Sequence, residues 1–86
     1  MAKRIVKPPK EAVTLGWVMR DLSPDQLRFT ISSKLARLTP ENELERGYAM
    51  FDRHLAAGNI VEGKSIGMFP KIPTYRVANP DAPALI

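Results

Sequence analysis

Apolar residues recur at helical spacing in two stretches in the middle of the chain. The first stripe comprises Leu27, Ile31, Leu35 and Leu38. The second comprises Leu44, Tyr48, Phe51 and Leu55. Because residues three or four positions apart share one face of an α-helix, the pattern predicts two amphipathic helices that bury these stripes. Gly47 lies beside the second stripe, where it is expected to allow close contact between the helices.

Two similar phrases mark where these helices are expected to begin. They read SPDQ, from Ser23 to Gln26, and TPEN, from Thr39 to Asn42. Each offers a hydroxyl N-cap, a proline suited to the first helical position and an acid that complements the positive helix end. Gln26 is expected to complete a capping box with Ser23. Two such starts in tandem predict two helices joined by a very short connection.

Upstream of these helices, the segment from Pro9 to Leu22 is interpreted as a further helix. Its apolar residues fit one helical face; they are Leu15, Val18, Met19 and Leu22. The phrase AVTLGW within it contains β-branched residues and Gly16, which leaves a strand as the alternative. Trp17 is expected in the core, because one large aromatic side chain fills much of a small domain.

Downstream, Gly58 is expected to end the last helix as a left-handed C-cap. The phrases NIVEG, from Asn59 to Gly63, and TYRVA, from Thr74 to Ala78, are predicted to be the strands of a hairpin. Between them runs a loop rich in glycine and proline, from Lys64 to Pro73. The terminal NPDAPALI, from Asn79 to Ile86, is hostile to helix and is expected to be a loose tail.

The order helix, helix, short turn, helix and hairpin resembles the winged helix-turn-helix superfamily. The resemblance rests on LERGYAMFDRHLAAGNIVEG, from Leu44 to Gly63, followed by TYRVA. It implies a mostly α fold with a small β-hairpin, in which a two-stranded ribbon covers the open side of three helices. The expected winged-helix domain spans residues 11–78, between a flexible basic arm at 1–10 and the loose C-terminal tail at 79–86.

The resemblance also implies binding to double-stranded DNA, with the last helix in the major groove and the hairpin on an adjacent groove or on phosphates. On the last helix, Asn42 and Arg46 are suited to read adenine and guanine edges. Three acids near its start would repel phosphate; they are Glu41, Glu43 and Glu45. Complementing the helix N-terminus is the alternative role of Glu41 and Glu43.

The middle helix offers a second face suited to DNA. Opposite its apolar stripe lie hydrogen-bonding and basic side chains, among them Thr30, Ser33, Lys34 and Arg37. Such a face suits phosphates and base edges, and an ordinary solvated surface is the alternative. The sequence therefore leaves open which of the two helices docks.

Charge supports the same interpretation without requiring it. The 86 residues fit one small domain and carry a formal net charge of +4. The cations expected on phosphates in the arm and the hairpin are Lys3, Arg4, Lys7, Lys10, Lys64, Lys71 and Arg76. For the arm, an unstructured solubilising terminus is the alternative. With so few base-reading groups, a homodimer on a two-fold DNA site is a plausible way to gain affinity.

The hairpin loop also carries apolar residues, Ile66, Met68 and Phe69, with Ile72 close by. Either they fold back over the small core, or they form an exposed patch for a dimer, another protein or a wedge between base steps. The patch supports an alternative function. In that hypothesis the chain is a protein–protein interaction module that docks through the loop and the acidic last helix.

Other function classes lack the residues they need. The chain has no cysteine and a single histidine, His54, which is expected to complement the negative end of its helix. These residues cannot form a metal site, a catalytic triad or a phosphate-binding glycine loop. The chain is therefore not expected to be an enzyme or to bind a cofactor or a small-molecule substrate. We expect a cytoplasmic regulator of transcription or replication, of bacterial or phage type, without a membrane span.

Overall fold

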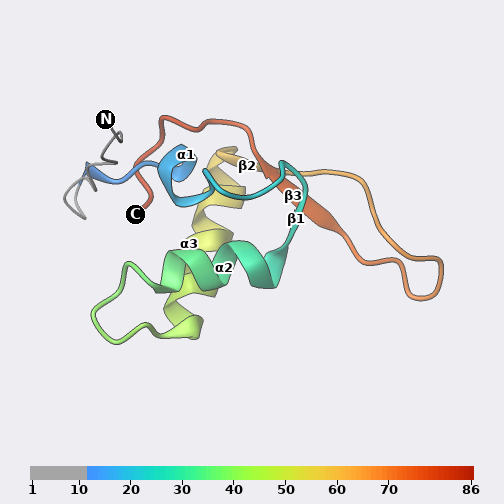
Figure 1. The fold of residues 1–86 in the computed structure, drawn as a ribbon, viewed down its shortest axis with the longest axis horizontal. Helices are drawn as coiled ribbons and strands as arrows, with labels where there is room; N and C mark the ends of the chain where they lie inside the picture. The colour runs from blue at the N-terminus through green and yellow to red at the C-terminus, as the bar shows by residue number, and fades with distance from the viewer. Residues whose placement is uncertain (1–11) are drawn as a thin grey trace, which may run out of the picture.

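The computed structural model describes residues 12–86 (Figure 1). The basic arm and the predicted helix start at Pro9 lie outside the described residues. Within them, the elements follow in the order α1 Leu15–Val18, β1 Gln26–Leu27, α2 Arg28–Ala36, α3 Leu44–Ala57, β2 Ile60–Glu62 and β3 Thr74–Val77. The strands form one antiparallel sheet in the order β1-β3-β2. The fold thus comprises three helices and a three-stranded sheet, one strand more than the predicted ribbon.

The core is enclosed by α2, α3, the sheet, the α1 segment and the C-terminal segment, and it depends on few large side chains. Phe51 of α3 is fully buried, as are Ile31 and Leu35 of α2. The Phe51 ring meets the ring of Tyr75 on β3 edge to face, with 4.9 Å between centroids. Trp17 packs against this core with part of its surface exposed, close to the predicted role.

Gly47 sets the distance between α2 and α3, as its position beside the stripe predicts. A Cβ at residue 47 would lie 2.1 Å from the Ser32 carbonyl oxygen and 2.9 Å from the Ala36 Cβ. No side chain fits in that space, so the helix backbones approach as closely as only glycine permits. Figure 1 shows the result, with α2 crossing directly over α3.

This contact rotates α3 away from the predicted orientation. Its buried face comprises Gly47, Met50, Phe51 and His54. Of the predicted stripe, only Phe51 is fully buried, whereas Leu44 is 37% and Leu55 is 38% exposed. The predicted stripe is therefore wrong in phase, because the fit of the glycine against α2 outweighs the burial of two leucines.

The two cap phrases form turns instead of helix starts. At the first, Gln26 Nε2 donates to Ser23 Oγ and to the Ser23 carbonyl, each at 3.1 Å, in place of the side-chain-to-backbone N–H bonds of the predicted capping box. No helix begins there, because Gln26 and Leu27 pair with Tyr75 and Thr74 of β3. Sheet pairing has replaced the local signal, and α2 begins only at Arg28.

At the second phrase, Thr39 Oγ1 accepts from the Glu43 backbone N–H at 3.1 Å, four residues on. Asn42 has a φ of 55°, so the chain leaves the helical region between Pro40 and the first residue of α3, Leu44. The prediction that Pro40 is the first helical residue is wrong. TPEN lies within the connection between α2 and α3, residues 37–43, which is longer than the very short connection predicted, and Asn42 belongs to it.

The end of α3 and the hairpin agree with the sequence. Gly58 adopts a φ of 82° and donates its N–H back into the last turn of α3. The strands β2 and β3 then pair in register Ile60↔Val77, Val61↔Arg76 and Glu62↔Tyr75. The hairpin loop, residues 63–73, extends well beyond the body of the molecule (Figure 1).

The predicted helix from Pro9 to Leu22 is wrong in extent. The described part of that segment contains only the single turn α1, capped by Thr14 Oγ1, which accepts from the Trp17 N–H at 3.2 Å. The C-terminal segment meets this turn: the Leu15 N–H donates to the Ala82 carbonyl at 3.0 Å and the Gly16 N–H to the Pro80 carbonyl at 2.9 Å.

The C-terminal tail is consequently packed, not loose as predicted. Ala84 is fully buried, and its N–H donates to the Val13 carbonyl at 2.9 Å. His54 Nε2 lies 2.8 Å from the Ala84 carbonyl oxygen, and Asn59 Nδ2 lies 3.1 Å from His54 Nδ1. Since only a ring nitrogen with a hydrogen donates to a carbonyl, Nε2 is the donor and Nδ1 the acceptor. His54 lies in the last turn of α3, as predicted, and is in addition a buried link between α3 and the tail.

We expect Gly47→Ala to destabilise the fold by about 2 kcal/mol, because the added methyl collides with the Ser32 carbonyl and forces α2 and α3 apart. Alanine is the better helix former, so a loss in spite of that preference isolates the packing effect. Urea unfolding monitored by Trp17 fluorescence measures it. Ala49→Val, which adds bulk to the exposed side of α3, serves as control, and equal stability of the two variants would contradict the close contact.

We expect His54→Ala to cost about 2–4 kcal/mol, since it opens a cavity and leaves the Ala84 carbonyl without its donor. Hydrogen exchange at the Ala84 and Leu15 amides should quicken more than exchange in α2, because the tail is released first. Leu55→Ala, next along the helix but partly exposed, is the control. If both variants exchange alike, the imidazole does not hold the tail.

Candidate nucleic-acid interface

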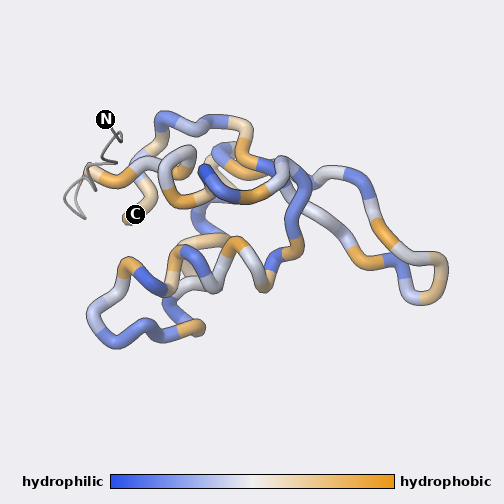
Figure 2. Tube along the Cα trace, viewed as in Figure 1, coloured by the Kyte–Doolittle hydropathy of each residue, from blue (hydrophilic) through white to orange (hydrophobic). Residues whose placement is uncertain are grey.

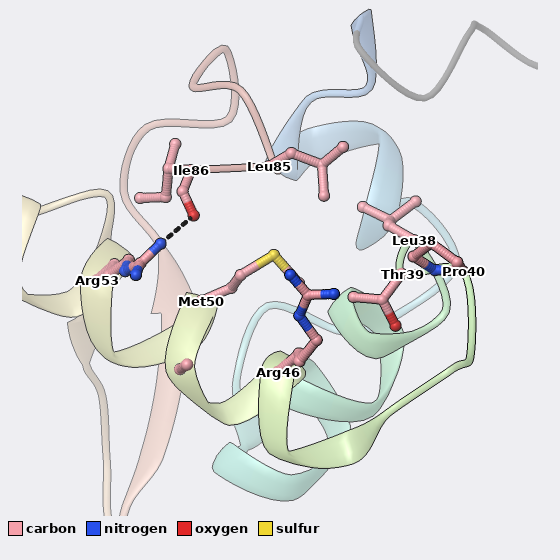
Figure 3. A pocket seen from close by; sticks show the side chains of 9 residues that line it. Leu38, Thr39, Pro40, Arg46, Met50, Arg53, Leu85 and Ile86 are labelled. Carbon is pink, nitrogen blue, oxygen red and sulfur yellow. Dashed lines mark hydrogen bonds between the residues drawn. The ribbon is translucent and has the colours of Figure 1, made fainter.

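The exposed side of α3 carries two arginines about two helical turns apart, Arg46 and Arg53. They flank an open hollow of about 460 Å³ (Figure 3). Its other lining residues come from α3, the turn before it and the chain end; they are Leu38, Thr39, Pro40, Ala49, Met50, Leu85 and Ile86. Arg53 donates to the Ile86 carbonyl at 2.9 Å, which fixes one edge of the hollow.

The side of α3 farthest from the core is built from small and acidic residues. By helical periodicity it comprises Glu45, Ala49, Asp52 and Ala56, all of which are exposed. The side chains of the two alanines project little from the helix, so another molecule can approach the helix backbone closely. Arg46 and Arg53 then stand along one margin of the surface.

Arg28 at the start of α2 neutralises Asp52. Its Nη2 lies 3.1 and 3.2 Å from the two carboxylate oxygens of Asp52, and its guanidinium carbon lies 4.3 Å from the Tyr48 ring centroid. Sequence reasoning did not single out Arg28 as a site residue. Its proximity to Asp52 depends on the close crossing of α2 and α3, which no local pattern reveals.

The acids before α3 form a second local feature. A hydrogen bond between the Glu41 and Glu43 carboxyl groups, desolvation and the charge of Glu45 raise the pKa of Glu43, against an opposing effect of Arg46. A carboxyl with a raised pKa beside other acids indicates concentrated negative charge. The entrance to α3 is therefore the part of its surface least suited to phosphate.

The candidate residues on α2 lie on a different side of the molecule from those on α3. Because Ser32 and Ala36 face Gly47, helical periodicity turns Thr30, Lys34 and Arg37 away from α3. Ser33 is half-buried between the two sides. The structure therefore does not join the α2 and α3 candidates into a single surface.

Near the C-terminal end of α2, Lys34 and Arg37 meet α1 instead. Together with Arg20 they line a small hollow, walled by Trp17, Val18 and Leu38. The Arg20 guanidinium lies over the Trp17 ring, 4.1 Å from its centroid. This gathering of cations follows from the tertiary contact between α1 and α2.

The hairpin cations divide into two kinds. Lys64 and Lys71 are exposed on the hairpin loop. Arg76, on β3, bonds to Asp25 with 2.9 Å between Nη2 and Oδ1, so much of its charge is already matched. The loop lysines are thus the more available of the predicted hairpin contacts.

The net charge is concentrated at the start of the sequence. Residues 12–86 contain nine basic and eight acidic residues. Most of the excess comes from the predicted arm, whose cations Lys3, Arg4, Lys7 and Lys10 lie outside the described residues. The described body is nearly neutral, so its pattern of charge matters more than its sum.

Within residues 12–86, no group of three or more His, Cys, Asp or Glu side chains is placed to hold a metal ion. In the same part of the chain no helix has the length and apolarity needed to cross a membrane. Comparison with protein-family models, curated proteins and solved structures finds no match. The site must accordingly be judged from its own residues.

We expect Glu41→Gln to lower the pKa of Glu43 towards its ordinary value, because a carboxyl partner is lost. In the parent chain the folded state retains this proton where the unfolded state has released it. The stabilising contribution is full below the ordinary pKa and is lost as the pH rises through the raised pKa. A carboxyl-detected NMR titration of Glu43 measures the change, with Glu62→Gln on β2 as control. An unchanged pKa in Glu41→Gln would contradict the pairing.

Proposed function

We propose that this chain is a winged-helix protein that binds double-stranded DNA and regulates transcription or replication. In this proposal α3 lies in the major groove and the hairpin loop acts as the wing. The order of helices and strands, with β3 between β1 and β2, supports the winged-helix assignment. The sequence of α2, a connection over residues 37–43 and then α3 is also compatible with it, since a helix-turn-helix pair presents its second helix to DNA.

The observation that carries the proposal is the exposed side of α3. The helix is anchored underneath by Gly47 and Phe51, and its outer side is low because of Ala49 and Ala56. Such a surface lets a helix backbone approach the floor of the major groove, where alanine also suits a thymine methyl group. Arg46, on the margin, has the length and the guanidinium fork to reach a guanine edge.

Electrostatics divides the proposed interface into parts with different roles. Arg28 reduces the repulsion that Asp52 would exert on phosphate. Repulsion from Glu41 and Glu43 favours an approach in which the middle of α3 comes closest to DNA. The loop lysines, Lys64 and Lys71, would then supply phosphate contacts beyond the groove. The positive charges of the arm cations would add to this attraction. Binding of two copies to a two-fold DNA site would strengthen it further.

A second candidate is a protein-interaction module that uses the same fold. The acids around the start of α3 favour it, because they suit a basic protein surface better than DNA. The exposed apolar side chains of the hairpin loop would add contact area. Salt-sensitive retention of duplex DNA favours the first candidate. Failure to retain duplex even at low salt, combined with capture of a purified partner, favours the second.

We expect Arg46→Gln to weaken binding to a mixed-sequence DNA duplex about tenfold, because the fork that contacts a base or phosphate is lost. Fluorescence anisotropy at two salt concentrations measures this, and parent affinity should fall steeply with salt. Arg20→Gln removes the same charge beside Trp17, away from α3, and should bind like the parent. Equal loss in both variants would show that net charge alone governs binding. No binding by the parent chain at low salt would overturn the proposal.

A further inference from the structure

The tip of the hairpin loop is a turn closed by backbone hydrogen bonds. Ile66 and Ile72 exchange two backbone hydrogen bonds, each 2.8 Å long, and thereby close the segment Gly67–Lys71. Gly67 adopts a φ of 82°, and a Cβ there would lie 3.1 Å from the Pro70 carbonyl oxygen. At the loop's base, the Thr74 hydroxyl donates to the Lys64 carbonyl. These bonds hold the two arms of the loop together and fix which side chains stand at its end.

The side chains at this tip are apolar and almost wholly in solvent. Phe69 is 97% exposed and Met68 is 81% exposed, and Ile66 and Ile72 behind them are 48% and 44% exposed. They do not fold back over the core, which was one of the two expectations from sequence. Figure 2 shows apolar segments on this extension far from the body. Apolar residues gathered at such a projection mark a surface that is covered in a complex.

The charge around the tip indicates the chemistry of its partner. The loop from Gly63 to Pro73 contains Lys64 and Lys71 and no acid. A suitable partner is therefore negatively charged at its surface and offers an apolar interior within reach of a narrow ribbon. Duplex DNA has this layering, with phosphates outside and stacked bases within. A second copy of the same tip is disfavoured, because it would bring like charges together over a small patch.

We propose that Met68 and Phe69 form a wedge that enters the minor groove and separates one base step, while Lys64 and Lys71 hold the flanking phosphates. The inference rests on the proposed DNA binding and specifies how the hairpin takes part in it. Apolar wedges of phenylalanine, methionine or proline are known means of unstacking a base step, which kinks the duplex. The closed turn behind the tip provides the stiffness that such insertion needs.

The test compares the 86-residue chain with three variants on one A·T-rich duplex that carries a donor dye at one end and an acceptor dye at the other. Anisotropy at low salt reports binding, and energy transfer between the duplex ends reports bending. Met68→Ala/Phe69→Ala should bind about tenfold more weakly, as expected for lost stacking, and should not bend the duplex when saturated. Met68→Leu/Phe69→Leu keeps an apolar wedge and should restore bending. Phe29→Ala removes an exposed aromatic from α2, outside the loop, and should behave like the parent.

The outcomes separate the wedge from the underlying function. If the parent chain and the double-alanine variant bind and bend the duplex equally, the wedge is refuted while DNA binding stands. If the parent chain retains no duplex at low salt, the proposed function itself fails. Capture by anionic lipid vesicles that depends on Phe69, without duplex bending, would overturn the wedge in favour of a membrane surface. Self-association abolished by the double-alanine variant, again without bending, would overturn it in favour of a dimer contact.

Discussion

The close approach of α2 and α3 at Gly47 is the contact on which the rest of the structure depends. It brings the α3 backbone against the Ser32 carbonyl and thereby fixes the rotation of α3 about its own axis. That rotation decides which residues are core and which are surface. Met50 and His54 turn inward, whereas Leu44, Leu55 and the margin with Arg46 turn out. The chemistry available on α3 is thus a consequence of one missing side chain.

The same crossing explains how the chain manages its charges. Arg28 reaches Asp52 only because the start of α2 lies over the middle of α3. Arg76 reaches Asp25 because the pairing of β1 with β3 brings that short segment to the sheet. Exposed ion pairs of this kind add little to stability. Their effect is on the surface potential, since they remove an acid from the exposed side of α3 and a free cation from β3.

Local signals predicted the parts of the fold that local energy controls. Gly58 needs a left-handed conformation that glycine adopts without strain. The two strands after it are separated by a loop rich in glycine and proline, which marks the hairpin clearly. Signals failed where a distant partner competed. Ser23 and Gln26 stay in contact, yet their bond is not a capping box, and β3 holds Gln26 in a strand. The tail reads as loose because its partners, Val13, Leu15 and His54, lie far away in sequence.

The candidate site shows the same division. Individual cations such as Arg46 and Lys71 can be recognised from sequence as exposed and basic. Whether they share a surface depends on the path of the backbone, which turned the α2 candidates away from α3 and left the loop lysines on their own extension. Arg28 illustrates the converse, because its role exists only through contacts with residues on another helix.

The hairpin loop has a consequence for how such a protein can change over generations. Every residue from Lys64 to Pro73 is exposed, and none belongs to the buried cluster that holds the helices together. Apart from Gly67, whose positive φ the turn requires, side chains there can be exchanged without disturbing the buried cluster. The surface that this appendage presents can therefore vary over generations with little risk to the integrity of the body that carries it.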